Sequence, residues 1–318
     1  MLVSKIKGQA ISLPVFVLAA VSTAYAQTNG RTESSWTDLT TQPSRGQLFE
    51  QYSRKAGRAL PSAFRFPHDA IYDLNGTLRQ DAIFGIDISH YEGSAFPLSE
   101  LAGQKVSFIY MKATQETDSA DKTFDHNWKT VGSLPEGQKI PRGAFHFLSS
   151  NPQMTGAAQA DSFVDYVNLH GKWQDDDLLP AVDLEWDKKC KACLDRWQTR
   201  HRTPDQIIGT TLDFLAQVKR RIGRTPIIYT NKSFLKDNHI TSADQIDKLT
   251  KGHKVWIFDL DSRDRAVELP NPNNNLSHVL WQFSFGAKLS LPNYSGSFDA
   301  DVFKGKPEAF KDALQGTD

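Results

Sequence analysis

The sequence has few cysteines, no net charge and no long apolar run beyond its first residues. Of its 318 residues only 2 are cysteine, and 37 basic side chains balance 37 acidic ones. A balanced charge gives no electrostatic reason to expect nucleic acid or an anionic membrane surface as a partner, and the missing apolar run excludes a spanning helix in the body of the chain. Two thiols fall short of the four ligands of a structural zinc site. We therefore expect no nucleic acid, no stable membrane insertion, and no metal or other cofactor.

Residues 1–26 have the pattern of an export signal. Lys5 and Lys7 precede a mostly apolar stretch that is too short to span a membrane, and Ala24-Tyr25-Ala26 forms a small-x-small cleavage site. No cysteine stands at this site, so we expect no lipid anchor there. We expect a signal peptide at 1–26 and a protein that acts in the periplasm or outside the cell.

The two cysteines lie close together, in Cys190-Lys191-Ala192-Cys193. In an exported protein this spacing favours a small structural disulfide over redox chemistry. His201 is the one histidine nearby, which gives weak support for a metal site. The surrounding segment Lys188–Arg202 is strongly basic. It could clamp the substrate or bind a protein partner, and a solvated loop is the simpler interpretation.

Residues 27–80 form an N-terminal extension in which no chemistry is visible. The segment starts with a long polar stretch, and Pro61, Pro67 and Asn75-Gly76 interrupt any regular structure. We expect a tether, a strap over the main domain, or a contact for a protein partner. The main domain is expected at 81–306, followed by a C-terminal tail at 307–318.

From residue 82 onward, short runs rich in β-branched and aromatic residues alternate with amphipathic segments. Strands that alternate with helices predict parallel βα units, and eight strands predict a closed barrel whose site lies at their carboxyl ends. The last connections look too short, or too rich in proline and asparagine, for full helices. We therefore expect an α/β fold with an irregular TIM-like barrel.

The expected strands are Ile83–Ile88, Val106–Lys112, Gly143–Phe147, Leu179–Leu184, Pro226–Thr230, Lys254–Asp259, Val279–Phe283 and Ser297–Val302. The expected helices are Phe124–Val131, Thr155–His170 and Pro204–Ile222, the last with Thr203 as its N-cap.

The segment Leu178–Trp186, LLPAVDLEW, reads as a buried strand that ends in two carboxylates. Side chains alternate along a strand, so Asp183 and Glu185 share a face, roughly 6.5–7 Å apart at the backbone. Neighbouring carboxylates that cannot both ionise easily split their pKa values, and a hydrolase that needs one proton donor and one stabilising carboxylate uses such a split. The alternative is an acidic loop that happens to follow a strand.

Polar or aromatic side chains stand at the end of every expected strand. Each has a simple structural explanation, such as a core histidine or a packed tryptophan. Together, at the mouth of a barrel, they would line one bowl with carboxylates and aromatic rings, which suits a polymeric substrate rich in hydroxyl groups. These residues are Asp87, Ser89, Lys112, Thr114, His146, Asp183, Glu185, Tyr229, Trp256, Asp259, Trp281, Gln282, Asp299 and Asp301.

An ordered set of short motifs extends over about residues 83–303. It comprises GIDIS at 85–89, FIYMKAT at 108–114, DHNW at 125–128, GAFHF at 143–147, QADSF at 159–163, VDLE at 182–185, PIIYT at 226–230 and WQF at 281–283. No single motif is decisive, but the full ordered set resembles the glycoside hydrolase family 25 lysozymes, the Chalaropsis-type muramidases. The resemblance implies a barrel of five βα units followed by three strands. It also implies hydrolysis of the β-1,4 bond between N-acetylmuramic acid and N-acetylglucosamine in peptidoglycan, whose glycan strands are the expected partner.

The resemblance assigns roles to residues that match the family by position. Glu185 matches the general acid, and Asp183 matches the carboxylate that assists at the anomeric carbon or orients the N-acetyl group. Asp87 is the third expected catalytic residue. The expected substrate-binding residues are Asp299, Tyr229, Lys112, His146, Trp281 and Trp256.

The sixth strand departs from the family pattern, because Phe258-Asp259 follows Trp256-Ile257 where the family usually has alanine and then an aromatic residue. This puts the usual sugar contact there in doubt. A rival interpretation is a glycan-binding module on an inactive barrel, against which the intact Asp87, Asp183 and Glu185 argue. A metal-dependent deacetylase would need a close histidine pair, which the sequence lacks. Retaining, inverting and substrate-assisted pathways stay open, because a sequence does not supply the distance between the carboxyl groups.

Overall fold

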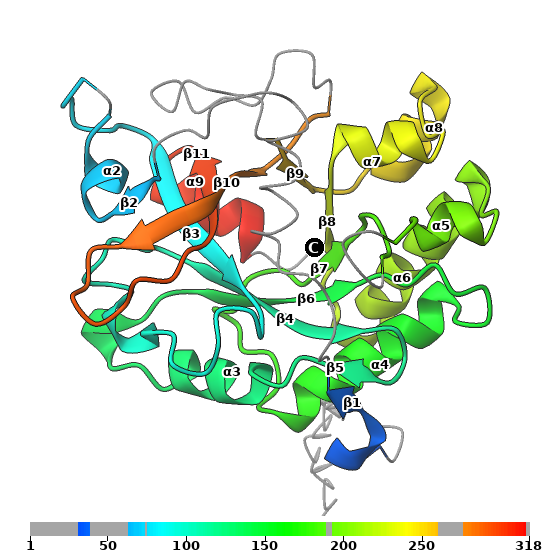
Figure 1. Cartoon of the computed structure of the whole chain (residues 1–318), viewed down its shortest axis with the longest axis horizontal. Coiled ribbons are helices and arrows are strands. Elements are labelled where there is room, and N and C mark those ends of the chain that lie inside the picture. The colour runs from blue at the N-terminus through cyan, green and yellow to red at the C-terminus, as the bar shows by residue number, and fades with distance from the viewer. Residues whose placement is uncertain (1–30, 39–62, 74, 189–192, 260–275, 316–318) are drawn as a thin grey trace, which may run out of the picture.

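The computed structural model describes residues 31–38, 63–73, 75–188, 193–259 and 276–315, and its centre is a closed barrel of eight strands (Figure 1). Around the ring the order is β3-β4-β6-β7-β8-β9-β10-β11, and β11 pairs with β3 again. The predicted barrel is therefore confirmed. The barrel strands are β3 (Ala82–Ile88), β4 (Ile109–Gln115), β6 (Arg142–Phe147), β7 (Ala181–Asp183), β8 (Ile227–Thr230), β9 (Val255–Phe258), β10 (Leu280–Leu289) and β11 (Phe298–Lys304).

The last barrel strand runs against its neighbours. Every pair from β3 around to β10 is parallel, whereas β11 is antiparallel to both β10 and β3. An antiparallel strand needs only a short connection, and the turn between β10 and β11 is formed by residues 290–297. The short connections in the sequence predicted an irregular last third of the barrel. The antiparallel direction of β11 is the cause of this irregularity.

Helices follow the middle strands and cover the outside of the barrel (Figure 1). The three predicted helices are present, and α6 has the expected capping: the Thr203 hydroxyl accepts from the backbone N–H of Gln206 at 3.3 Å, and Pro204 opens the helix. Helices α7 and α8 were not predicted, and only a 3₁₀ turn, η2 (Leu98–Glu100), lies between β3 and β4. The α-helices are α2 (His68–Ile71), α3 (Phe124–Gly132), α4 (Gly156–Leu169), α5 (Arg196–Thr199), α6 (Pro204–Ile222), α7 (Lys232–Asp237), α8 (Ala243–Thr250) and α9 (Pro307–Leu314).

Strand alternation divides the buried side chains into two clusters. On β9, for example, Trp256 belongs to the cluster inside the barrel, whereas Val255 and Ile257 belong to the cluster between the barrel and its helices. The interior cluster consists of Phe108, Tyr110, Phe145, Leu178, Leu179, Ala181, Ile227, Tyr229, Trp256, Leu280, Phe303, Phe310 and Leu314.

Helix α9 closes the amino-terminal end of the barrel. Phe310 and Leu314 belong to the interior cluster, Phe310 packs edge-on against Phe303 at 5.4 Å, and the Leu314 carbonyl accepts from the N–H of Leu179 at 2.6 Å. The segment expected as a C-terminal tail thus contributes to the interior of the barrel.

Two parts of the N-terminal extension lie within the described residues, and both pack on the barrel. Strand β2 (Arg65–Phe66) pairs with Lys288 and Leu289 of β10, and Phe64 packs against Phe84 and Phe283 at ring distances of 5.1 and 5.0 Å. The second part contains η1 (Glu33–Ser35) and β1 (Thr37–Asp38), which pairs with β5 (Ser119–Ala120). These contacts support the expected strap. The expected signal peptide lies outside the described residues, and within them no helix has the length and apolar character needed to cross a membrane.

Candidate active site

Polar side chains replace the apolar interior cluster at the carboxyl ends of the strands. On β7, Ala181 points inward and Val182 outward, so Asp183 points inward. On β10, Leu280 points inward and Trp281 outward, so Gln282 points inward by the same argument. We call the resulting set the bowl, and each member is at most 5% exposed: Asp87, Lys112, Asp183, Tyr229, Gln282, Asp299 and Asp301.

Two acids of the bowl are direct cross-strand neighbours. Asp87 on β3 is paired with Asp299 on β11, and like charges in such a pair repel each other. The side-chain amide of Gln282 donates to Oδ2 of Asp87 in a short hydrogen bond and to Oδ2 of Asp299 at 3.4 Å. The Tyr229 hydroxyl donates to the amide oxygen of Gln282 at 2.6 Å, which fixes the orientation of the amide. Gln282 therefore joins three of the predicted site residues into one network.

The floor of the bowl consists of aromatic rings that hold a further acid. Trp256 packs against Tyr110 at 4.8 Å and against Tyr229 at 5.0 Å, and its indole N–H donates to Oδ1 of Asp301 at 2.9 Å. Burial, together with the charge of Asp301, raises the pKa of Tyr110 well above its usual value. The Tyr110 hydroxyl therefore stays protonated and donates to the Leu179 carbonyl at 3.0 Å.

Asp183 and Glu185 differ in their exposure to solvent. Asp183 is 1% exposed and ends β7, whereas Glu185 lies two residues farther on and is half-buried. Between them, Leu184 packs into the outer cluster and its N–H donates to the Tyr229 carbonyl at 2.9 Å. The indole N–H of Trp197 donates to the Glu185 carbonyl at 3.0 Å. The backbone is thus held on both sides of Glu185, which is less buried than Asp183.

Lys112 lies on the wall of the bowl. Its Nζ donates to Oε1 of Gln115 at 3.0 Å and lies 4.7 Å from the centre of the Phe147 ring. A cation held against an aromatic face is favourable. These contacts hold Lys112 at the inner wall of the bowl.

Two predicted substrate-binding residues lie outside the bowl. His146 points outward between the barrel and its helices, where it contacts Thr114 Oγ1 at 2.8 Å and stacks on Phe214 at 4.9 Å. Burial lowers the pKa of His146 to about 3, so the ring is neutral. Trp281 also points into the outer cluster, and its indole N–H donates to the Asp259 carbonyl at 2.8 Å. The structure does not bring these two side chains to the carboxylates.

Sequence reasoning named Gln282 among the residues expected to line the bowl but gave it no catalytic or substrate-binding role, whereas the structure places it at the centre of the network. The signal was present in WQF, because a glutamine between two aromatic residues on a strand points opposite to both of them. It also missed a pair of half-buried rings, Phe258 and Phe285, which stack at 4.5 Å beside the bowl. Phe258 ends β9 in the region where the sequence departs from the family pattern.

The described part of the basic loop after β7 is tied to the ends of neighbouring strands. Asp187 accepts from the N–H and hydroxyl of Ser150 at 2.9 and 2.6 Å and from Nε of Arg196 at 2.8 Å. Arg196 also lies 3.3 Å from Glu116, and Arg200 donates to the Ser150 hydroxyl at 2.8 Å. These contacts give the two arginines a structural role beside Glu185.

Cys193 is disulfide-bonded, and the chain has one other cysteine, Cys190, which lies outside the described residues. Among the residues that the structure describes, no group of three or more His, Cys, Asp or Glu side chains is arranged to hold a metal ion. The carboxyl groups at this end of the barrel are the half-buried Glu185 at the mouth and the buried acids of the bowl.

Comparison with known proteins finds a matching family and similar relatives. The family model described as glycosyl hydrolases family 25 matches residues 86–290. Lysozyme M1 from Streptomyces globisporus is 29% identical over 233 residues, which are 72% of this chain and 70% of that protein.

Solved structures of a lysozyme and of a family 25 glycosyl hydrolase have the same fold. A bacterial lysozyme from Streptomyces coelicolor is 24% identical with a TM-score of 0.59, covering 74% of this chain and 98% of that one. A family 25 glycosyl hydrolase from Bacillus anthracis is 22% identical with a TM-score of 0.57, covering 72% and 92% of the two chains. The barrel with its acidic bowl, the match over most of the barrel and these likenesses agree with one another. The chain belongs to glycoside hydrolase family 25, the family of lysozymes that its motifs resemble.

Proposed function

We propose that this glycoside hydrolase is an exported muramidase that cleaves the β-1,4 bond between N-acetylmuramic acid and N-acetylglucosamine in peptidoglycan. The observation that carries the proposal is the half-buried Glu185 at the mouth of a bowl of buried acids. Similarity to lysozyme M1 supports the substrate, and the export pattern at 1–26 supports action in the periplasm or outside the cell.

Glu185 is the general acid in this proposal. The bond between the anomeric carbon and the bridging oxygen breaks, and the proton of Glu185 moves to that oxygen, which leaves as a hydroxyl. A water molecule then supplies the new hydroxyl at the anomeric carbon, and its other proton restores Glu185. The role requires a carboxyl group that substrate can approach, and Glu185 is more exposed than the acids of the bowl.

Asp183 stabilises the positive charge that develops at the anomeric carbon. Its burial at the end of β7 gives its charge a strong local effect, because little water screens it. Its further role depends on the pathway: it forms a bond to the anomeric carbon in a retaining reaction, takes a proton from the attacking water in an inverting one, and orients the N-acetyl group in a substrate-assisted one. Asp87 completes the catalytic set, and the Gln282 amide holds it in place.

The remaining inward residues would bind the sugar. Asp299, Tyr229 and Lys112 present a carboxylate, a hydroxyl and an amine around the bowl, and Trp256 forms its floor. His146 and Trp281 act from the outer layer in this arrangement, by supporting the strands rather than by touching the sugar.

The decisive variant is Glu185→Gln, which keeps the shape of the side chain and removes its proton. We expect the rate of peptidoglycan digestion to fall by about 10²–10⁴-fold, the usual contribution of general acid catalysis, while glycan binding persists. Asp183→Asn should also be severely impaired, and less so if Asp183 only orients the substrate. Digestion of purified peptidoglycan at wild-type rate by Glu185→Gln would show that the proposed acid is wrong.

The cleaved bond is identified by the new reducing ends. After digestion, borohydride should reduce N-acetylmuramic acid at the new reducing ends. Reduction of N-acetylglucosamine there instead would contradict the bond assignment. A wild-type protein that binds peptidoglycan and releases no reducing ends would favour the rival function, a glycan-binding module on an inactive barrel.

A further inference from the structure

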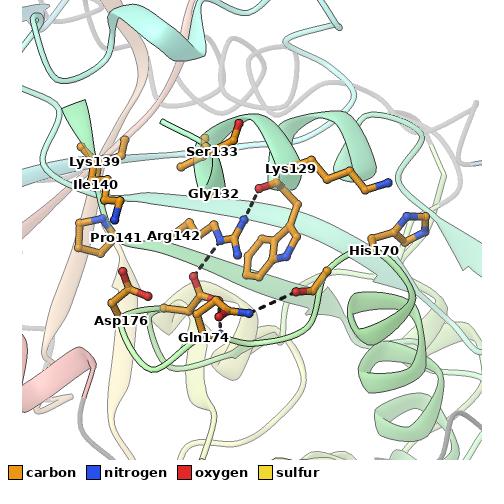
Figure 2. A pocket seen from close by; sticks show the side chains of 14 residues that line it. Lys129, Gly132, Ser133, Lys139, Ile140, Pro141, Arg142, His170, Gln174 and Asp176 are labelled. Atoms are coloured by element: carbon orange, nitrogen blue, oxygen red, sulfur yellow. Dashed lines mark hydrogen bonds and ion pairs between the residues drawn. The ribbon is translucent and has the colours of Figure 1, made fainter. Parts of the chain in front are cut away.

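A second pocket opens at the end of the barrel opposite the bowl (Figure 2). Its volume is about 610 Å³, and its walls are the second half of α3, the segment that leads into β6 and the loop between α4 and β7. Arg142 begins β6 and Phe147 ends it beside the bowl, so the two sites are separated by the length of a strand, roughly 17 Å. A ligand in this pocket is therefore bound apart from the bond that is cut.

The back wall of the pocket is a buried arginine held against a tryptophan. The guanidinium of Arg142 lies 3.9 Å from the centre of the Trp128 ring and donates to Oδ1 of Asp177 at 2.8 Å and, in a short bond, to the Trp128 carbonyl. Arg142 is 7% exposed and Asp177 is 3% exposed. A Cβ on Gly132 would collide with the guanidinium, so the glycine makes room for it. These contacts within the protein fix the shape of this wall before any ligand binds.

The loop between α4 and β7 is equally fixed. Arg224 donates to the carbonyls of Gln174 and Asp177 at 2.7 and 2.8 Å, and the N–H of Gln174 donates to Oδ2 of Asp177 at 2.7 Å. Asp177 is therefore fully engaged within the protein. The pocket keeps its shape without a ligand to order it.

Two buried nitrogen atoms of the pocket have no hydrogen-bond partner among the described residues: Nε1 of Trp128 and Nε2 of His170. Trp128 is 0% exposed and His170 is 3% exposed. The Nδ1 atom of His170 contacts Asp125 at 2.6 Å. Gly171 also lines the pocket, and a Cβ built on it would lie 3.6 Å from Nε1 of Trp128. Because buried polar groups are nearly always hydrogen-bonded, these two nitrogens are hydrogen-bonding groups at the pocket wall that the described residues leave unused.

Two lysines stand at opposite ends of the pocket, with Arg142 between them (Figure 2). Lys129 pairs with Asp125 at 2.5 Å and Lys139 with Glu136 at 2.8 Å, and all four side chains are at least 38% exposed. Exposed ion pairs of this kind are weak, so both ammonium groups can exchange partners with an incoming anion.

Donors predominate over free acceptors in this pocket. The one exposed acid among its lining residues is Asp176, since Asp177 is taken by Arg142. Two separated ammonium groups, with the Arg142 guanidinium and the Trp128 indole N–H as further donors, fit an extended, amide-rich chain that carries more than one carboxylate.

We propose that this pocket binds the carboxylate-bearing peptide stem of peptidoglycan, and the identity of that polymer rests on the proposed function. The barrel would then hold the wall at two places, with the glycan in the bowl and a stem peptide of the surrounding material at the opposite end. Such a second contact raises the effective concentration of polymer at the enzyme.

The test uses the full-length wild-type protein and a free tetrapeptide stem, which the bowl cannot hydrolyse. Titration should shift the indole N–H resonance of Trp128, and calorimetry should give a Kd that Lys129→Glu with Lys139→Glu weakens by about tenfold or more. The matched control is Lys248→Glu on α8 with Lys251→Glu directly after it, where both lysines form exposed pairs with aspartates, and its Kd should equal the wild-type value. Amidation of the peptide carboxylates should weaken binding by a similar factor.

Each other outcome overturns the proposal. Equal affinity in the two double variants, equal affinity for the amidated peptide, or no shift of the Trp128 resonance would contradict a carboxylate site. Acetate or free D-alanine that binds as tightly as the tetrapeptide would identify the pocket as a site for small carboxylates. Failure of the proposed function is distinguishable from failure of this inference. The first is detected as an absence of new reducing ends from peptide-free glycan, whereas the peptide titration requires no turnover.

Discussion

The two ends of the barrel use the same strands for opposite purposes. At the amino-terminal end the inward side chains are apolar, and Phe310 and Leu314 of α9 fill the opening. At the carboxyl end the next inward positions on the same strands are acids, an amide and a lysine. The inward positions of the strands alternate in the same way at both ends. Only the residue type changes, so apolar side chains pack at one end and reactive polar side chains gather at the other.

The energetics of the two ends differ accordingly. Burial of apolar surface at the closed end contributes about 25 cal/mol for each Å² removed from water. Burial of several carboxyl groups at the open end is unfavourable unless hydrogen bonds offset it, which is the role of Gln282, Tyr229 and Trp256. Substitutions at the two ends should therefore separate stability from activity.

The largest effect is expected at the closed end. Phe310→Ala removes a buried ring from the interior cluster and should lower the free energy of unfolding by about 3–5 kcal/mol, while the folded fraction retains its kcat. Denaturant titration and activity per folded molecule measure the two quantities. Lys311→Ala, on the exposed side of the same helix, should leave both unchanged. A large loss of kcat in folded Phe310→Ala would show that the ends are not independent.

A smaller effect, on catalysis, is expected from Gln282→Leu. The variant removes the donor to Asp87 and Asp299 and the acceptor of the Tyr229 hydroxyl. Misplaced catalytic groups typically lower rates by about 10²-fold, and we expect a loss of that order in kcat. Gln159→Leu is the comparison, because Gln159 is an equally buried glutamine that contacts His146 and Ser149 in the outer layer. It should reduce stability and leave kcat within a few-fold of wild type; equal losses of kcat would contradict the special role of Gln282.

The pH dependence of stability should report on the outer layer. Because burial holds the pKa of His146 at about 3, below its ordinary value of 6.5, the unfolded chain binds a proton in this range that the folded chain does not. Stability should therefore fall as the pH drops from about 6.5 towards 3, by at most about 1.4 kcal/mol per pH unit from this group. His146→Gln should remove that slope from denaturation midpoints measured between pH 4 and 7. His126→Gln, on the exposed face of α3, should keep it.

The smallest effect is expected at the aromatic pair beside the bowl. If Phe258 stacks on a sugar ring, Phe258→Ala should raise KM by about 2–10-fold, the equivalent of one aromatic contact, with little change in kcat. Tyr72→Ala alters an aromatic residue that is 37% exposed in the extension and should not affect KM. An unchanged KM in Phe258→Ala would place the sugar elsewhere in the bowl.

Most of the barrel could be predicted from sequence because its signals are local. Each strand is a short β-branched or aromatic run, and α6 begins with Thr203-Pro204. Helices α7 and α8 were missed because both are short, 6 and 8 residues, and their amphipathic pattern covers about two turns at most. The packing of Phe64 on Phe84 and of α9 in the barrel depends on contacts between distant segments, which periodicity does not reveal.

The site was predicted in part for the same reason. Asp87, Asp183 and Asp299 follow from alternation at strand ends, and the structure brings all three inward. His146 and Trp281 were assigned from their place in a motif without counting which face they occupy, and alternation directs both outward. The pocket behind β6 had no sequence signal, since Arg142, Trp128 and Asp177 are far apart in the chain and meet only after folding.

The antiparallel last strand has a consequence for biosynthesis. Asp299 lies on the strand that closes the barrel and faces Asp87 on the strand that opens it, so the acidic pair is assembled from residues more than 200 positions apart in the order of synthesis. A nascent chain that has not yet released β11 from the ribosome has an open barrel and an incomplete bowl. Hydrolytic activity therefore requires that the whole barrel sequence has been delivered.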